Sequence, residues 1–380
     1  MQTEKIKIGI VFFDEKHIIP HFIGPVKEMF QDPDIDVQIL TYQNPDSFLY
    51  KSLQENKLPQ NIIKELPTYR YRKLLEKLKS RKIPSPLYLF KKHKNFLLNE
   101  YDVLVFNDIN HEYLHRYKKN EKPKFVLLMH GAGDREYLIG KKYEESIAKF
   151  DLVTTSGQKV TEFFKKMHLP HTKIEICGYQ KFDLINLKKP KKFFDNDKPT
   201  VLYNPHFSKE LSSWYPFGKD ILDFFYQQKD YNLIFAPHIN LFNKKGFLNP
   251  DIIDQKYFKD ENILIDLGSD HTVNMDYTLS ADIYLGDVSS QIYEFLYTSK
   301  PAIFINTHKP NWENNPHYRH WKMGPVIKDL SALKALLDKA PVWHQNFKKK
   351  QLDLMSYTFA NFKDLTASKK IVQAIKSLTG

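Results

Sequence analysis

Cysteine is almost absent from this chain of 380 residues, because Cys177 is the single one. A disulfide framework and a cysteine-based metal cluster are therefore excluded. Long apolar runs are absent as well, since none approaches the roughly 20 residues that a membrane-spanning helix needs. The opening MQTEKIKIGIVFF has the pattern of a strand rather than of a signal peptide. We therefore expect a soluble, cytoplasmic protein.

Several sequence motifs of known site types are also missing. The β–α–β opening, with strands over Lys5–Phe13 and Val37–Thr41 and a helix over Ile23–Phe30, contains no Gly-x-Gly-x-x-Gly, which disfavours a dinucleotide site there. No Asp-x-Asp follows a strand, and the histidines lack the spacing of a metal-binding helix. No recognised nucleic-acid-binding fold is visible. We therefore expect no metal ligands, no required cofactor and no nucleic-acid partner.

Positive charge is in excess. The net charge of +12 and the pI of about 9.2 indicate an anionic partner. Between Arg70 and Lys94 the chain carries ten Lys or Arg residues against one acid, with leucines and aromatic residues between them. This segment, 70–94, resembles a patch for an anionic membrane surface or another polyanion. A solvated basic helix fits the pattern equally well.

The order of elements predicts an α/β protein with two Rossmann-like domains that face each other across a cleft. The first domain is expected over 1–187 and would hold the acceptor. A lysine- and proline-rich stretch, Leu187–Lys198, reads as the linker. The second domain is expected over 188–360 and would hold the nucleotide donor. A last helix, within 361–380, is expected to pack back on the first domain.

The stretch 263–306 carries the strongest site signal. It predicts buried strands over Ile263–Asp266, Asp282–Leu285 and Ala302–Ile305, and a helix over Gln291–Ser299. In the turn before that helix, Ser289 and Ser290 could accept phosphate together with the backbone N–H groups. Glu294, one helical turn on, could hydrogen-bond ribose hydroxyls. Taken alone, the two serines also fit an ordinary helix cap.

Histidines follow two predicted strands. His130 ends the strand Lys124–Met129 and is followed by Gly131 and Gly133, which favours a general base beside backbone that a ligand can approach. Next to it, Arg135 is a candidate phosphate clamp. His238 follows the strand Asn232–Phe235 and is held by Pro237.

Two further groups of residues could be ordinary surface residues. His17 and His21 lie in the first β–α loop, which faces the cleft in such sheets, and of the two interpretations we favour surface histidines. The loop Asn306–Gly324 would either line the cleft or pack on the surface, and its candidates are Trp312, His317, Arg319, His320 and Trp321.

Four motifs in this order resemble the CDP-glycerol glycerophosphotransferase family, whose members build teichoic-acid and related polyol-phosphate polymers. They are His130-Gly131, the turn Gly178-Tyr179-Gln180-Lys181-Phe182-Asp183, Ala236-Pro237-His238, and SADIYLGDVSSQIYEF around Ser289. The resemblance covers about 100–325. It implies a GT-B fold and transfer of glycerol phosphate from CDP-glycerol to a hydroxyl, with release of CMP.

Carried over residue by residue, the resemblance makes His130 the base and His238 a contact of the donor diphosphate. The remaining assignments are donor binding by Ser289, Ser290, Glu294, Asp287, His206 and Ser208, and phosphate or acceptor contacts by Gly131, Arg135, Lys181 and Arg319. Mg²⁺ would be bound only through the donor diphosphate.

The chain departs from the family pattern at three places. Gln180-Lys181 stands where the family has Pro-Arg, Ala132 where it has Thr, and Leu285-Gly286-Asp287-Val288 where it has Thr-Asp-Tyr before the two serines. Two other hypotheses stay open at this point. One is a GT-B glycosyltransferase that uses a nucleotide sugar. The other is a non-catalytic protein that binds a polyanion or a membrane. The leading hypothesis is an enzyme of surface-polysaccharide assembly, such as teichoic acid or capsule, peripheral on the inner face of the plasma membrane.

Overall fold

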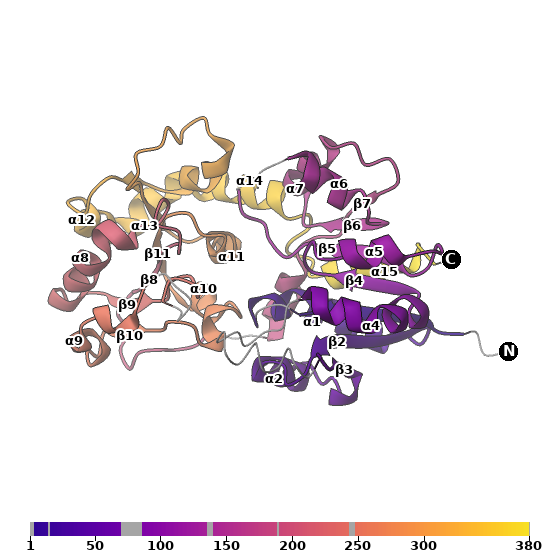
Figure 1. Cartoon of the computed structure of the whole chain (residues 1–380). Coiled ribbons are helices and arrows are strands. Elements are labelled where there is room, and N and C mark those ends of the chain that lie inside the picture. Colours follow the sequence, from indigo (N-terminus) through magenta and orange to yellow (C-terminus); the bar gives the residue numbers. More distant parts are fainter. Residues whose placement is uncertain are drawn as a thin grey trace. The chain divides into compact units, whose positions relative to one another are not determined.

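The computed structural model describes residues 4–13, 16–69, 86–134, 140–187, 190–242 and 248–379. By their internal contacts these residues form two compact units (Figure 1). Unit 1 takes the described residues up to 130, those of 140–187 and those from 356 on. Unit 2 takes 131–134 and 190–355. The chain therefore passes from one unit to the other directly after His130.

Within the described residues, unit 1 holds a seven-stranded sheet in the order β3-β2-β1-β4-β5-β6-β7, in which all neighbours are parallel. The inner strands β4 and β5 are short apolar runs, as buried parallel strands are, whereas the edge strands β3 and β7 contain both apolar and charged residues and are partly exposed. Their bounds are β1 Ile6–Phe12, β2 Ile35–Tyr42, β3 Ile63–Leu66, β4 Val103–Phe106, β5 Lys124–Leu128, β6 Leu152–Thr155 and β7 Lys173–Ile176.

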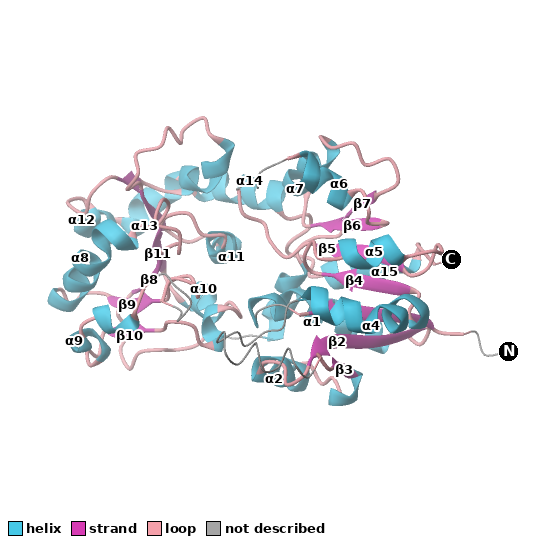
Figure 2. Ribbon diagram, viewed as in Figure 1, coloured by secondary structure: helices cyan, strands magenta, loops and turns pink. Residues whose placement is uncertain are grey.

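Helices cover both faces of this sheet (Figure 2), because alternate strand residues point to opposite sides. Val11 packs with buried residues of α4, α5 and α7, whereas the Phe12 ring lies 5.0 Å from the Phe22 ring of α1. The helices and 3₁₀ turns of unit 1 are η1 Lys16–Ile18, α1 Ile19–Gln31, α2 Ser47–Glu55, η2 Gln60–Ile62, α4 Pro86–Glu100, α5 Glu112–Tyr117, α6 Lys141–Ile147, α7 Gln158–Lys165, η3 Gln180–Leu187 and α15 Ala367–Lys376.

In unit 2 the described residues form a six-stranded parallel sheet in the order β10-β9-β8-β11-β12-β13. Its core includes stacked rings, since Phe235 lies 5.5 Å from Tyr203 and 4.9 Å from Trp214. The strands are β8 Thr200–Asn204, β9 Asn232–Phe235, β10 Ile263–Ile265, β11 Ile283–Gly286, β12 Ala302–Ile305 and β13 Val326–Ile327. The helices and 3₁₀ turns are α8 Trp214–Gln227, η4 Pro250–Ile252, α9 Gln255–Phe258, η5 Asp270–Thr272, α10 Asp276–Ser280, α11 Gln291–Phe295, η6 Leu296–Thr298, η7 Pro316–Met323, α12 Leu333–Asp338, α13 Ala340–Trp343 and η8 His344–Asn346. The helix α14, Lys348–Thr358, leads back to unit 1.

The C-terminal helix α15 belongs to unit 1. Asp183, the last residue of the glycine turn motif, accepts hydrogen bonds from the backbone N–H groups of Ala367 and Ser368 at the start of α15, at 3.3 and 2.6 Å. Gly178 has a φ of +99°, and a Cβ there would lie 3.1 Å from the Ala367 Cβ. The motif therefore needs glycine at this position and acts partly as the support of the last helix.

Several sequence predictions of single elements were wrong. The sequence pattern predicts helices over Lys219–Gln228 and near Phe362–Ser377, but α8 begins at Trp214 and the last helix begins at Ala367. The strand β13 and the helix α14 were not predicted. Residues 44–100 have the least regular pattern of the sequence, but the described part of this stretch includes α2, β3 and α4.

The basic segment 70–94 is described only from Pro86 on, where it forms the start of α4. Leu89 and Phe90 are fully buried in the core of unit 1, so these two apolar side chains are not available to a membrane surface. None of the described helices combines the length and the apolar character that crossing a bilayer requires.

Candidate active site

Each unit has a point at which the strand order reverses, and such points favour ligand binding at the carboxyl edge of a parallel sheet. In unit 1 it lies between β1 and β4, and in unit 2 between β8 and β11. The turns after β1 and β4 carry His17 and Asn107, and those after β8 and β11 carry His206 and Asp287. Two of these residues, His206 and Asp287, were predicted site residues, whereas His17 and Asn107 were not.

His130 follows β5 in unit 1. Its Nδ1 lies 2.6 Å from the backbone carbonyl oxygen of Asn107. A carbonyl oxygen only accepts, so Nδ1 carries the hydrogen and Nε2 is the basic nitrogen of the neutral ring. Burial lowers the pKa of His130. A neutral imidazole of this tautomer is suited to take a proton from a hydroxyl group.

The interpretation of His17 and His21 as surface histidines was wrong. Pro20 in the first turn starts α1 at Ile19, so His21 lies inside the helix and is only 5% exposed. Its ring lies 6.0 Å from that of His130 and 5.5 Å from that of Tyr179. Burial and the neighbouring His130 and Lys181 lower the pKa of His17 to about 4 and also lower that of His21.

Lys181 joins the same group of side chains. It is 5% exposed. The preceding residue, Gln180, donates from Nε2 to the carbonyl of Met129 at 3.0 Å, which fixes the turn beside His130. Where the family has Pro-Arg, this chain therefore has Gln180, which anchors the turn, and Lys181, which carries a positive charge.

In unit 2, the carboxylate of Asp287 accepts hydrogen bonds from three residues of its own unit. Its side chain is buried, and Oδ1 accepts from the N–H of His206 at 2.9 Å and of Val288 at 2.6 Å. Oδ2 accepts from the N–H and the hydroxyl of Ser213 at 2.5 and 2.7 Å. Because Ser213 precedes α8, the carboxylate also lies at a helix N-terminus. Burial raises the pKa of Asp287 despite these donors.

His206 and His238 have the opposite tautomer to His130. His206 Nδ1 accepts from the N–H of Ser208 at 3.0 Å, and His238 Nδ1 accepts from the N–H of Asn240 at 3.2 Å. The neutral rings therefore carry their hydrogen on Nε2 and can donate it. The two rings lie 5.8 Å apart with Phe207 against both. The hydroxyl of Ser208 donates to Glu210 at 2.6 Å.

The turn before α11 gives its two serines different surroundings. Ser289 is buried, and its Oγ accepts from the N–H of Gln291 at 3.3 Å. Ser290 is exposed and does not cap the helix with its side chain. Glu294 is 7% exposed within α11. Of the three, Ser290 is the side chain most open to a ligand.

The glycine segment after His130 is fixed in unit 2 by Asp134. The buried carboxylate of Asp134 accepts from the N–H and the Nδ1 of His320 at 2.9 and 2.7 Å, and from the hydroxyl of Tyr293. His320 Nε2 faces the backbone carbonyl of Asp287 at 3.1 Å, to which Trp321 Nε1 also donates at 2.8 Å. A carboxylate and a carbonyl are both acceptors, so the His320 ring serves both only as a double donor.

Sequence reasoning missed Asp134, Ser213 and Tyr293, and left His320 and Trp321 undecided between cleft and surface. The last two are buried, at 2% each. An acid in a glycine-rich turn after a strand was the available signal for Asp134. Of the remaining candidates, Gly131 has open space around its Cα, Arg319 is half-buried in η7, and Arg135 lies outside the described residues. The described residues contain no group of three or more His, Cys, Asp or Glu side chains that could hold a metal ion.

Two parallel α/β units with polar turns at the carboxyl edges of their sheets are the architecture of the GT-B fold class. The chain matches the CDP-Glycerol:Poly(glycerophosphate) glycerophosphotransferase family over residues 76–377. It belongs to that family, and it is therefore a transferase. No curated protein matches the chain.

Solved structures confirm the fold. The wall teichoic acid polymerase TagF, in a complex with CDPG, is 16% identical with a TM-score of 0.65, and the match covers 98% of this chain and 88% of that one. A UDP-N-acetylglucosamine 2-epimerase from Listeria monocytogenes is 12% identical with a TM-score of 0.65, over 99% and 97% of the two chains. The S. aureus MnaA–UDP structure is 14% identical with a TM-score of 0.65, over 98% and 97%.

Proposed function

We propose that this transferase moves glycerol phosphate from CDP-glycerol to a hydroxyl of a cell-surface glycan or lipid-linked acceptor and releases CMP. Family membership supports the donor class, and the likeness to TagF, whose structure holds CDPG, agrees with it. The observation that carries the proposal is the bond of His130 Nδ1 to the Asn107 carbonyl, because it makes Nε2 the basic nitrogen.

In the proposed step the acceptor hydroxyl oxygen attacks the phosphorus that carries glycerol. The P–O bond to CMP breaks, and its electron pair leaves with CMP, while the hydroxyl proton moves to Nε2 of His130. Because burial lowers the pKa of His130, the ring is neutral and ready to accept that proton at neutral pH.

Negative charge that grows on the phosphate oxygens needs hydrogen-bond donors. We assign this role in unit 2 to the Nε2–H groups of His206 and His238 and to the turn Ser289-Ser290. Asp287 is assigned to positioning, since four protein donors already occupy its carboxylate. Contact of Glu294 with the ribose stays a prediction. Where Mg²⁺ takes part, we expect it to enter with the donor diphosphate.

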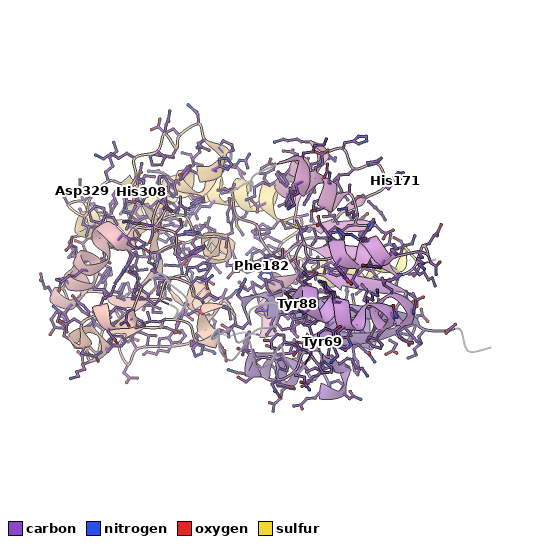
Figure 3. All side chains as sticks on the ribbon, viewed as in Figure 1. Tyr69, Tyr88, His171, Phe182, His308 and Asp329 are labelled. Carbon is purple, nitrogen blue, oxygen red and sulfur yellow. The ribbon has the colours of Figure 1, made fainter. Side chains whose placement is uncertain are left out.

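Replacement of the base tests this mechanism. In His130→Ala, release of CMP in the presence of acceptor should fall about 10²–10⁴-fold, while stabilisation of the protein by CDP-glycerol is kept. The matched control is His171→Ala, because His171 is an exposed histidine of unit 1 (Figure 3) and should leave turnover unchanged. Full turnover in His130→Ala would refute the assignment.

The donor is tested by thermal unfolding with CMP, CDP-glycerol and the sugar conjugates of UDP and GDP. A ligand at about 100 times its Kd adds about 2.7 kcal/mol of stability. Stabilisation by cytidine compounds alone supports the proposal, whereas stabilisation by uridine or guanosine compounds alone would mean glycosyl transfer.

We also propose that the enzyme is cytoplasmic and peripheral on the anionic inner face of the plasma membrane. The support is the net charge of +12 and the ten basic residues of 70–94. The ten basic side chains should make the binding mainly electrostatic, and Leu89 and Phe90 are buried and do not insert. Co-sedimentation with anionic vesicles should therefore disappear at high salt and be absent with zwitterionic vesicles. Salt-resistant binding to both would contradict this picture.

A further inference from the structure

A buried ion pair in unit 2, His320 with Asp134, is not used by the proposed reaction. His320 Nδ1 and a carboxylate oxygen of Asp134 are 2.7 Å apart, and the two side chains are 3% and 0% exposed. Because His320 Nε2 faces the backbone carbonyl of Asp287 at 3.1 Å, both ring nitrogens donate and the ring carries a positive charge. A buried ion pair stabilises a fold no better than well-packed apolar residues of similar volume. Its presence here therefore needs another explanation.

The ion pair holds both ends of the turn 287–290, which contains the two serines and which we call the serine turn. At the start of the serine turn, the ring of His320 donates to the carbonyl of Asp287. Just after its end, the hydroxyl of Tyr293 in α11 donates to the carboxylate of Asp134. The ring and the carboxylate are bonded to each other, so the two ends of the serine turn are fixed to one buried unit.

The carbonyl of Asp287 is held by a second side chain as well. Trp321 Nε1 donates to it at 2.8 Å, beside the Nε2 of His320. Both donors belong to buried residues of η7. The carboxylate of Asp287 accepts four further hydrogen bonds within unit 2. The acceptor oxygens of Asp287 are therefore used to fix the start of the serine turn.

The ion pair also fixes the glycine segment 131–134 beside the serine turn. The backbone N–H of His320 donates to the carboxylate of Asp134 at 2.9 Å, in addition to the contact of the ring. A Cβ placed on Gly133 would lie 3.6 Å from the Cβ of Ser290. The glycine segment and the exposed Ser290 are thus neighbours within unit 2, and the same pair of side chains determines where both of them lie.

We propose that His320 is a positioning residue of this transferase: with Asp134 it holds the serine turn where its serines meet the diphosphate of the nucleotide donor. The inference rests on the proposed function, which assigns donor phosphate binding to Ser289 and Ser290. His320 itself is buried and acts through the backbone of the serine turn. Such a role is sensitive, because a displacement of about 1 Å in a binding group can cost about 10²-fold in rate.

Two isosteric replacements separate the two contacts of the His320 ring. In His320→Asn the amide nitrogen takes the place of Nδ1, so it can donate to Asp134 but does not reach the carbonyl of Asp287. In His320→Gln the amide nitrogen takes the place of Nε2, so it can donate to that carbonyl, but the ring's contact with Asp134 is lost. Trp321→Phe removes the second donor to the same carbonyl and leaves His320 in place.

The experiment measures the Kd of CDP-glycerol by calorimetry and the Tm by thermal unfolding, both on the full-length protein. We expect His320→Asn and Trp321→Phe to raise the Kd about tenfold or more, and His320→Gln to raise it less than about threefold. The matched control is His344→Asn, because His344 is another buried histidine of unit 2, with Nε2 facing Gln351 Oε1 at 3.1 Å. The control should lower the Tm and leave the Kd unchanged.

A merely structural role of His320 predicts a different pattern. The Kd would then follow the Tm in all four variants, whichever hydrogen bond is kept, and that result would overturn the inference. A Kd in His320→Asn within about threefold of the wild-type value would also overturn it.

UDP-N-acetylglucosamine, measured beside CDP-glycerol, separates this inference from the proposed function. If the wild type binds only the uridine compound and the variants keep the expected order, the proposed function fails and the positioning role stands. If the wild type binds CDP-glycerol and His320→Asn binds it equally well, the proposed donor stands and the positioning role fails. A wild-type protein that binds neither compound would overturn both.

Discussion

Replacement of Asp287 by asparagine should destabilise unit 2 strongly. The carboxylate accepts four hydrogen bonds, two at each oxygen, from His206, Val288 and Ser213. Asparagine offers one oxygen and one NH₂ group. In either orientation of the side chain, the NH₂ group faces two N–H or O–H donors of the protein, and these two donors lose their acceptor. Breaking a buried charged network in this way costs about 3–5 kcal/mol. For a unit of this size that corresponds to a fall in Tm of about 6–20 °C.

The assay is thermal unfolding of Asp287→Asn beside a matched control, Asp329→Asn. Asp329 is exposed and bonds only locally, to the N–H and hydroxyl of Ser331 at 2.9 and 2.5 Å (Figure 3). The control should unfold like the wild type. Because Asp287 fixes the turn of His206, stabilisation by CDP-glycerol should also weaken in the variant. A Tm for Asp287→Asn within about 2 °C of the wild type would refute the reasoning, since two unsatisfied buried donors should lower the free energy of unfolding by more than such a small shift corresponds to.

Three further predictions concern stability. The pKa of His17 is lowered to about 4 and that of His111 to about 3, mainly by burial. The pKa of each histidine is lower in the folded than in the unfolded state, so its contribution to the free energy of unfolding is complete above about pH 6.5. As the pH falls below that value, each histidine lowers the free energy of unfolding by up to about 1.4 kcal/mol per pH unit. Urea midpoints at pH 7 and pH 5 should show this loss, and His111→Phe should reduce it, because that ring lies 3.7 Å from Phe150. Asp134→Asn should cost about 3–5 kcal/mol in the same assay, and an unchanged midpoint would contradict its anchoring role. Gly178→Ala should lower Tm, because its φ of +99° strains any other residue, and an unchanged Tm would contradict that.

The fold was predictable wherever an apolar run was bounded by turn residues. The strand β9 was predicted with its observed bounds, Asn232–Phe235, because a proline directly after Ala236 ends its apolar run. The strand β13 has only two residues, Val326 and Ile327, too few to show a pattern. The helix α14 opens with three lysines and reads as a solvated segment, although Gln351 in its middle is fully buried.

The site was predictable as a set of candidates but not as an arrangement. His130 and His238 stood out because glycine or proline adjoins each of them in the sequence. His21 did not, since its burial depends on Pro20 starting the helix earlier than the apolar pattern suggests. A proline at the first turn of a helix was the signal that could have corrected the reading.

The tautomer of each histidine, and with it the nitrogen that carries the hydrogen, could not be predicted from the sequence. His130 takes its tautomer from a carbonyl 23 positions away, whereas His206 and His238 take theirs from N–H groups two positions away. The local turns of the last two could in principle be inferred, because a histidine followed by such a turn often accepts from the backbone. The His130 tautomer depends on β4 pairing with β5, which is a property of the sheet order. The proposed base, His130, therefore differs from the proposed donors, His206 and His238, through the backbone group that faces Nδ1. On this proposal, a change in the Asn107 turn should lower turnover without altering the histidine itself.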